Sequence, residues 1–229
     1  MPKFLCLLIG CMLSFSCFSQ SYNIDSSLNA LNMQKDSMLQ AMMHADSVKA
    51  DKEYQEKIKW EKLKSVEIYP VFNAGEFSGV VPVKDPTEIP DPILNYKLLF
   101  EVTINNPDSA ADQINFSLSE VARIINLHVA SGIPLKKIFP VIIIHAKALN
   151  AITTNVYYQK HYKMDNPNIK LINDLSGIGA RFIACGQAMA FFNFKKEDLL
   201  PVVKVSLTAQ TALSSYQLMG YVKYKIQID

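Results

Sequence analysis

The pattern of hydrophobic and polar positions divides the chain into a helical part, an extended part and a part in which strands and helices alternate. From Ile24 to Val66 there is no proline or glycine, and apolar residues recur at spacings of three, four and seven. This spacing is typical of an amphipathic helix, although Lys35 and Lys49 interrupt the apolar seam. We therefore expect a helical extension over residues 20–66, built from one marginal helix or from a helix pair.

Lysine and glutamate residues dominate the second half of this extension. Interleaved charges at helical spacing support a solvent-exposed helix, and Tyr54, Ile58 and Trp60 are the apolar minority. Two interpretations stay open: a solvated spacer helix, and a coiled-coil arm for oligomerisation. A tether to a partner complex or to a membrane surface is a third idea, but the apolar face is too narrow for stable membrane insertion.

Residues 67–92 contain five prolines and two glycines. Proline fixes φ and removes a backbone donor, so we expect an extended, turn-rich linker here. Within it, we expect a short strand around Val80 that pairs with residues 69–72. The linker ends near Asp91, and a separate domain covers residues 93–229.

Strands and helices alternate in the domain over residues 93–229. The apolar run after Lys137 is nearly continuous, which is typical of a strand buried on both faces of a parallel sheet. The alternation predicts a three-layer α/β/α domain with a mostly parallel sheet of five or six strands. Strands are expected at 96–104, 137–146, 181–185, 202–207 and 221–226, and helices at 105–132, 149–162, 167–176, 187–192 and 208–220. The "GIGA" stretch at 177–180 precedes a strand, so it indicates a helix C-cap rather than a dinucleotide-binding loop.

The N-terminus has the pattern of a signal peptide over residues 1–19. Lys3 is the positive region, Phe4 to Phe15 is the apolar region, and a small residue precedes the expected cleavage point. The apolar stretch is shorter than the roughly 20 residues that span a bilayer. We expect export to the periplasm. Cleavage as a lipoprotein at Cys11 or Cys17 fits the sequence less well.

Only one of the four cysteines lies outside the leader. Removal of residues 1–19 leaves Cys185 alone, so no intrachain disulfide is possible and the thiol stays free. The formal net charge of +2 (23 Lys and Arg against 21 Asp and Glu) falls to +1 without Lys3. The charges are interspersed, so nucleic acid is not expected as a partner.

Polar side chains follow the expected strands, where ligands gather in open parallel sheets. Asn105, His145, Cys185 and Thr208 come at the ends of four strands, and Gln187 follows the cysteine closely. A thiol at a helix start meets unpaired N–H groups and the positive end of the helix dipole, which favour the thiolate. An imidazole across the site could take up the thiol proton.

A structural interpretation of the same residues also stays open. Unpaired cysteines are commonly small buried hydrophobes, and His145 could be a hydrogen-bonded histidine at the end of a strand. With one cysteine in the mature chain and four scattered histidines, no metal site is expected.

Five ordered stretches resemble the DsrE/DsrF-like sulfur-relay family, in a secreted subgroup with an N-terminal helical extension. They are "PVIIIHAKALNA", "DNPNIKLINDL", "FIACGQAMAF", "KKEDLLPVVKVSLTAQTAL" and "YQLMGY", and the resemblance covers residues 96–226. It implies an α/β/α domain that assembles into homo-trimers or hexamers. It also implies that Cys185 matches the cysteine that carries sulfur as a persulfide between a donor and an acceptor protein, without a metal or organic cofactor.

Two functions follow from these observations. In the first, Cys185 is a sulfur-carrying or redox-active thiol assisted by His145, and Gln187, Asn150, Thr208 and Asn105 line its pocket. In the second, the protein is a non-catalytic oligomeric module that binds a small ligand or a partner, and the thiol is buried packing.

Overall fold

The computed structural model describes residues 24–76 and 78–226. The predicted signal peptide and its three cysteines lie outside the described residues. The chain divides into two compact units, Met1–Lys59 and Trp60–Asp229. The second unit contains the α/β domain and the proline-rich segment before it.

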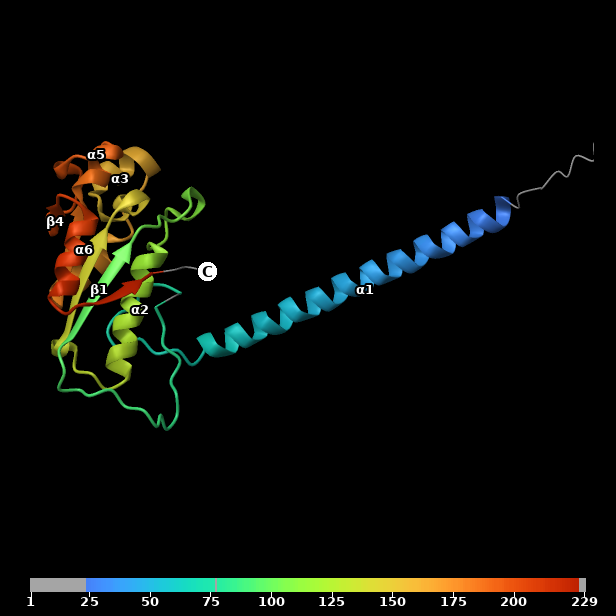
Figure 1. The fold of residues 1–229 in the computed structure, drawn as a ribbon, viewed down its shortest axis with the longest axis horizontal. Helices are drawn as coiled ribbons and strands as arrows, with labels where there is room; N and C mark the ends of the chain where they lie inside the picture. The colour runs from blue at the N-terminus through green and yellow to red at the C-terminus, as the bar shows by residue number, and fades with distance from the viewer. Residues whose placement is uncertain (1–23, 77, 227–229) are drawn as a thin grey trace, which may run out of the picture. The chain divides into compact units, whose positions relative to one another are not determined.

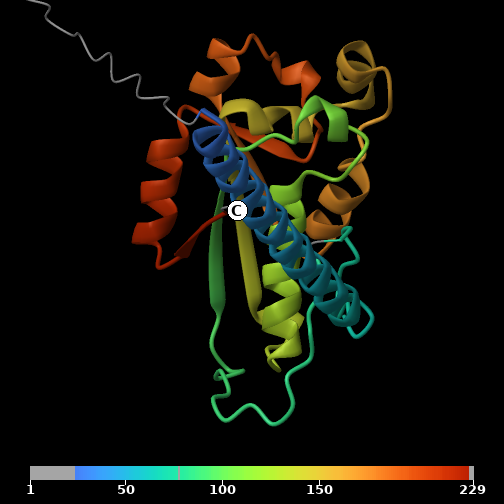
Figure 2. The same cartoon turned by 90° about the vertical axis from the view of Figure 1, so that its right-hand side faces the viewer.

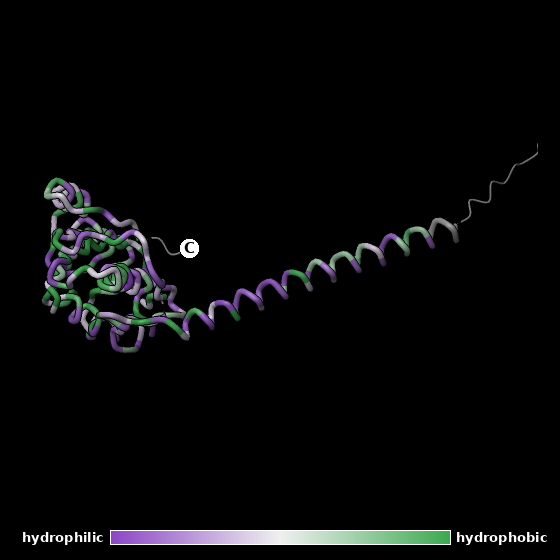
Figure 3. The backbone as a smooth tube through the Cα atoms, turned by 90° about the horizontal axis from the view of Figure 1, so that it is seen from below, coloured by the Kyte–Doolittle hydropathy of each residue, from purple (hydrophilic) through white to green (hydrophobic). Residues whose placement is uncertain are grey.

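The helical extension is one continuous helix, α1 (Ile24–Lys64), and not a helix pair. Its first half carries exposed apolar side chains, including Leu31, Met38 and Met42, whereas its second half is mostly hydrophilic (Figure 3). Lysine and glutamate residues form i,i+4 ion pairs in that second half. In the part of the chain that the structure describes, no helix combines the length and apolarity needed to cross a membrane.

Five parallel strands form the sheet of the second unit, in the order β4-β3-β2-β1-β5. They are β1 (Tyr96–Val102), β2 (Ile138–Ile144), β3 (Arg181–Cys185), β4 (Val203–Ser206) and β5 (Val222–Lys225). The inner strands β1, β2 and β3 are apolar at most positions, as strands buried on both faces must be. The predicted three-layer α/β/α fold with a parallel sheet is confirmed.

Helices cover both faces of this sheet. Leucine, isoleucine and valine residues of α2 (Phe116–Ala130) and α4 (Ile169–Gly177) pack on one face, and α6 (Ala209–Leu218) packs on the other. Figures 1 and 2 show α2 and α6 on opposite sides of the sheet. The remaining elements are η1 (Asp108–Ala110), η2 (Leu135–Lys137), η3 (Ala146–Ile152), α3 (Asn155–Tyr162), α5 (Gly186–Phe191) and η4 (Lys196–Asp198).

The helix after β1 begins later than the sequence suggests. Pro107 and the acidic residues after it form only the short turn η1, and α2 starts at Phe116. Asn115 caps α2, because its side-chain oxygen accepts hydrogen bonds from the N–H groups of Ser117 and Leu118. At the other predicted boundary, Gly179 has a φ of 90° just after α4, which confirms the helix C-cap.

The proline-rich segment before β1 has little regular structure. The expected strand pairing is reduced to a single antiparallel bridge between Ile68 and Val80. Pro70 and Pro82 follow these two residues closely and have no N–H to extend the ladder. The segment is instead held on α2 by the buried side chain of Asn126, which bonds its backbone.

Alternation along the strands decides which side chains reach the α6 face of the sheet. On β1, Leu99 packs in the cluster beneath α6, and Leu98 and Phe100 pack in the cluster on the opposite face. Successive side chains of a strand point to opposite faces, so Glu101 shares the face of Leu99. By the same alternation Cys185 lies on the α6 face, and the structure places it in that cluster.

Candidate functional site

The Cys185 thiol lies at the point where β3 ends and α5 begins. The residue is the last of the strand and the N-cap of the helix. It is only 5% exposed, and its neighbours on the inner side are aliphatic and aromatic side chains of the cluster beneath α6. On the outer side, Sγ accepts a hydrogen bond from the N–H of Ala209 at 3.2 Å. The sulfur therefore bonds to the start of α6, whereas it makes no cap hydrogen bond to α5.

A close backbone contact forms the rim of this site. The N–H of Gln187 donates to the carbonyl of Leu207 at 3.1 Å, which joins the start of α5 to the turn after β4. A β-carbon on Gly186 would lie 2.8 Å from the carbonyl oxygen of Ser206. The residue after the cysteine must therefore be small, because the turn over residues 206–208 leaves no room for a side chain.

His145 directly follows β2 and neighbours Cys185 in the strand register. Ile144 of β2 pairs with Ala184 of β3, and His145 and Cys185 are the residues that come next on each strand. The imidazole, however, is bonded to a different residue. Its Nε2 lies 2.9 Å from Oε1 of Glu101 on β1.

Glu101 also binds Lys223, so that three titratable side chains meet at this edge of the sheet. Lys223 Nζ lies 2.6 Å from the second carboxylate oxygen, Oε2. Glu101 is the most covered of the three, since its side chain is 19% exposed, against 27% for His145 and 33% for Lys223. Burial raises the pKa of Glu101, but the hydrogen bonds from Lys223 and His145 lower it by more, so the pKa of this carboxyl lies below its ordinary value.

Gln187 and Thr208 lie beside the thiol through their positions on the two helix starts. Gln187 is exposed in the first turn of α5. Thr208 is the N-cap of α6, where its Oγ1 accepts from the N–H of Gln210 at 3.3 Å. This cap fixes the start of α6 from which Ala209 donates to Cys185.

Asn105 and Asn150 have local hydrogen bonds that do not involve the thiol. Asn105 Nδ2 donates to the carbonyl of Asn106 and lies 3.4 Å from the hydroxyl of Tyr162 on α3. Asn150 Nδ2 donates to the carbonyl of Lys147 within η3. The structure therefore brings Cys185, Gln187 and Thr208 together through backbone contacts, and His145 is the neighbour of Cys185 in the strand register. The side chains of Asn105 and Asn150 make local hydrogen bonds and do not join this group.

Sequence reasoning missed Glu101 and Lys223. A usable signal for Glu101 was present, because a carboxylate stands within the otherwise apolar core of the "YKLLFEV" strand, two residues after buried Leu99. Charged residues are almost never fully buried without a partner. The identity of that partner depends on β5 lying next to β1, which the chain order does not reveal.

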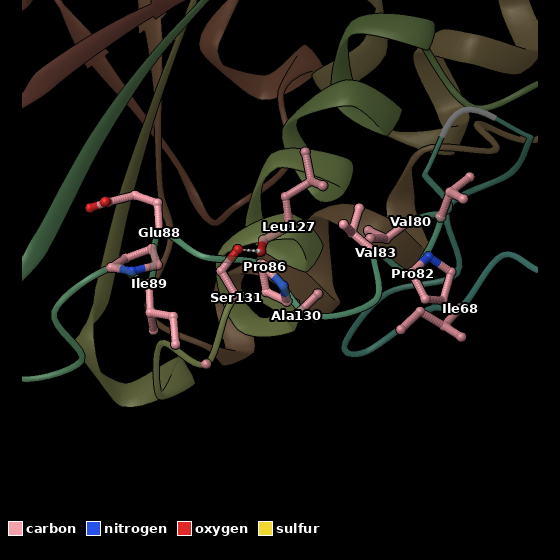
Figure 4. Close-up of a pocket in the computed structure, with 13 residues that line it drawn as sticks. Ile68, Val80, Pro82, Val83, Pro86, Glu88, Ile89, Leu127, Ala130 and Ser131 are labelled. Carbon is pink, nitrogen blue, oxygen red and sulfur yellow. Dashed lines mark hydrogen bonds between the residues drawn. The ribbon is translucent and has the colours of Figure 1, made fainter.

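A cavity of about 490 Å³ lies away from these residues (Figure 4). It lies between the proline-rich segment and the end of α2, and its lining is mainly aliphatic, with Val80, Val83, Ile89 and Leu127 among the residues. None of the six predicted site residues, all of which the structure describes, lines it. Glu88 and Ser131 are the residues with polar side chains in its lining.

Comparison with known proteins gives a match to a protein family and matches to solved structures. A sequence model of the DsrE/DsrF-like family matches residues 97–223, which is more than half of the 229-residue chain. The curated proteins contain no match. Among solved structures, the chain is similar to a protein of unknown function, MTH1491 from Methanobacterium thermoautotrophicum, with 18% identity and a TM-score of 0.43. That alignment covers 57% of this chain and 98% of the other.

Proposed function

The chain belongs to the DsrE/DsrF-like family, and on this premise we propose that it is an exported protein that handles sulfur through the Cys185 thiol, as a persulfide carrier or a thiol-redox protein. The hydrogen bond from the N–H of Ala209 to Sγ carries the proposal. An N–H donor at the first residue of a helix is the environment in which a thiolate gains most from the helix dipole. The thiolate is the reactive form of cysteine.

The length of α6, the helix that begins with Ala209, also supports a thiolate at Cys185. α6 has 10 residues and a side-chain cap at Thr208, so its N-terminal N–H groups are held in place. α5 has only six residues and adds little dipole of its own. The hydrogen bond of Ala209 therefore matters more for the charge on Cys185 than the helix that Cys185 itself caps.

Sulfur transfer at this position needs only the thiolate and a donor persulfide. The Cys185 thiolate attacks the outer sulfur of the donor, the donor S–S bond breaks, and the donor leaves as a thiolate. Cys185 then holds one additional sulfur, and the reverse step delivers it to an acceptor thiolate. No external oxidant or metal takes part in this exchange.

Access to the sulfur is the main requirement on the structure. Cys185 is 5% exposed, and the turn over residues 206–208 covers it. Leu207 and Gln187 on either side are exposed, so in our proposal the donor approaches at the junction between this turn and α5.

The test is the alkylation of Cys185 by iodoacetamide in the folded protein. The mature chain has this one cysteine, so every adduct reports on it, and C185S is the blank. We expect alkylation that is already fast at pH 7 and rises little toward pH 9, together with added sulfur on Cys185 when the protein is isolated without reductant and analysed by mass spectrometry. A thiol that reacts only after unfolding, and that carries no added sulfur, contradicts the proposal.

A second candidate function is a non-catalytic binding module, which the packing of the thiol favours. Cys185 belongs to the apolar cluster that includes Ile143, Leu213 and Tyr216, and it occupies the position of a small hydrophobe there. In this case C185A should change the free energy of unfolding more than it changes the binding of any ligand. Urea unfolding of C185A and C185S, compared with their alkylation data, separates the two candidates.

We also propose that the mature protein acts as a homo-oligomer in the periplasm. The support is the signal-peptide pattern of residues 1–19, the family's tendency to assemble and the position of β4 and β5 at the two edges of the sheet that the described residues form. Sedimentation of the mature chain, with and without residues 21–59, tests whether α1 is a spacer or an assembly arm. An unchanged oligomer after the deletion identifies a spacer.

A further inference from the structure

We propose that Glu101, held by Lys223, is a positioning residue that fixes His145 as the acceptor of the Cys185 thiol proton. The inference rests on the proposed thiol function and adds two residues to its site. Glu101 does not touch the sulfur in this arrangement. It acts through the imidazole.

The strand register places the imidazole beside the thiol. His145 follows Ile144, Cys185 follows Ala184, and Ile144 and Ala184 are paired across β2 and β3. Both side chains lie on the α6 face, because Ile143 and Ile183, two residues earlier on each strand, belong to the cluster beneath α6. Neighbouring strands of a sheet lie about 4.8 Å apart, so the backbones of these two residues are close enough for their side chains to meet.

The bond to Glu101 decides which ring nitrogen is available. Nε2 of His145 lies 2.9 Å from Oε1 of Glu101, and a carboxylate can only accept a hydrogen bond, so Nε2 carries the proton. The other nitrogen, Nδ1, is then the basic one in the neutral ring. In the described residues Nδ1 has no hydrogen-bond partner, and the hydrogen bond that Cys185 Sγ makes is the one from the N–H of Ala209, so the contact between Nδ1 and the sulfur belongs to the proposal. The proton of the Cys185 thiol passes to Nδ1, which leaves a thiolate and an imidazolium, and Glu101 stabilises the imidazolium.

Lys223 keeps Glu101 deprotonated, which is the form that this positioning role requires. A carboxylate that is largely covered would take up a proton more readily without a cationic partner, and Lys223 Nζ at 2.6 Å from Oε2 provides one. The lowered pKa of Glu101 agrees with this geometry. Among the described residues, Glu101 from β1 binds His145, Lys223 from β5 binds the same carboxylate, and Cys185 is the register neighbour on β3. The covering helix α6 has no charged side chain.

The experiment is a double-mutant cycle on the alkylation rate. Rates of iodoacetamide with Cys185 are measured from pH 5 to pH 9 in the mature protein and in E101Q, H145Q and E101Q/H145Q. E120Q is the matched control, because Glu120 is also partly covered and paired, with Arg123, but lies on α2. We expect E101Q and H145Q each to lower the rate at pH 7 about tenfold or more and to move the rise of the rate to higher pH. E120Q should leave the profile unchanged.

The cycle distinguishes a positioning role from a structural one. If Glu101 acts through His145, E101Q has no further effect once His145 is glutamine, so the double variant behaves like H145Q. Additive losses, or an E101Q profile that coincides with that of the starting protein, overturn the inference and leave the thiol function standing. An inert thiol in the starting protein overturns both.

A second substitution serves as a control for the possibility that E101Q fails to fold. Glu101→Asp keeps the charge but withdraws the carboxylate from Nε2 by one methylene, and the flexible side chain of Lys223 can follow the shorter carboxylate. We expect it to lower the rate at pH 7 as well, with circular dichroism and the unfolding midpoint close to those of the starting protein. A fully active E101D that has lost the contact with His145 in a crystal structure contradicts the inference.

Discussion

Nε2 of His145 lies 2.9 Å from Oε1 of Glu101, so the imidazole at the end of β2 is bonded to β1 and not to the cysteine on β3. The two residues come from neighbouring parallel strands, and both lie on the face that α6 covers. This contact, together with the ion pair between Glu101 and Lys223, should contribute to the free energy of unfolding. That contribution can be measured independently of any thiol chemistry.

We expect the contribution of Glu101 to stability to depend on pH. Its pKa is lower in the folded state than in the unfolded chain, where it is about 4.3. The stabilisation is therefore fully present above pH 5 and is lost as the pH falls through the folded pKa. E101Q should cost roughly 1–2 kcal/mol at pH 7, and this difference should shrink below pH 4.

Urea unfolding at pH 7 and at pH 3 checks this expectation. E88Q is the control, because Glu88 is exposed in the proline-rich segment and its replacement should be neutral at both pH values. An E101Q deficit of the same size at pH 3 and at pH 7 means that the carboxylate charge is not the cause.

The order of strands and helices could be predicted from the sequence because apolar residues dominate each inner strand. The "VIII" stretch of β2 has no helical interpretation at its length, and the helices after it begin at polar caps such as Thr208. The start of α2 could not be placed, since Pro107 with its acidic neighbours imitates a helix start and Asn115 does not stand out from nearby polar residues.

The candidate site was only partly predictable for a topological reason. The rule that ligand sites lie at the carboxyl ends of parallel strands placed Cys185 and His145 in one candidate site, and the structure shows that their strands are adjacent. It says nothing about the edge strand β5, which is last in the chain but pairs with the first strand, β1. The ion pair between Lys223 and Glu101 depends on that pairing, so no local pattern could have revealed it.

Replacement of Gly186 by alanine should destabilise the protein and loosen the cover of the thiol. The added Cβ would lie 2.8 Å from the carbonyl oxygen of Ser206 and 3.3 Å from that of Leu207. Both contacts are with backbone, so the turn must shift, at a cost of roughly 1–3 kcal/mol. We expect faster alkylation of Cys185 in G186A than in the starting protein.

The matched control for this substitution is G177A at the end of α4. A Cβ there meets nothing within 4 Å, so the change should be neutral or slightly stabilising. Unfolding midpoints and alkylation rates of the two variants are compared. Equal stability of G186A and G177A would show that the turn adapts freely, and the tight rim described above would then be wrong.

Asn126 should be the main anchor of the proline-rich segment. Its buried Oδ1 accepts from the N–H groups of Val71 and Phe72, and its Nδ2 donates to the carbonyls of Phe72 and Ser78. N126A leaves these backbone groups without partners, at a cost of roughly 1–3 kcal/mol for each that stays buried. We expect the segment to detach before the sheet unfolds, while N173A, on the exposed side of α4, has little effect.

Hydrogen exchange separates local from global loss in N126A. Amides of residues 68–80 should exchange much faster in this variant, and amides of β1 and β2 should keep their protection at neutral pH. Uniformly faster exchange would instead make Asn126 part of the global core.

The contribution of Tyr158 to stability should depend on pH in the alkaline range. Its hydroxyl donates to the carbonyl of Ala111 at 2.7 Å, and burial raises the pKa of Tyr158 to about 12. The unfolded chain ionises near pH 10, so the stabilisation by this hydroxyl is fully present below pH 10 and is lost as the pH rises through about 12. Y158F should cost roughly 1–2 kcal/mol at pH 8 because the carbonyl of Ala111 loses its donor, and the difference should narrow by pH 11. Urea unfolding at both pH values tests this, with Y54F in exposed α1 as the control. A Y158F deficit that does not narrow at pH 11 rules out ionisation of this hydroxyl as the cause.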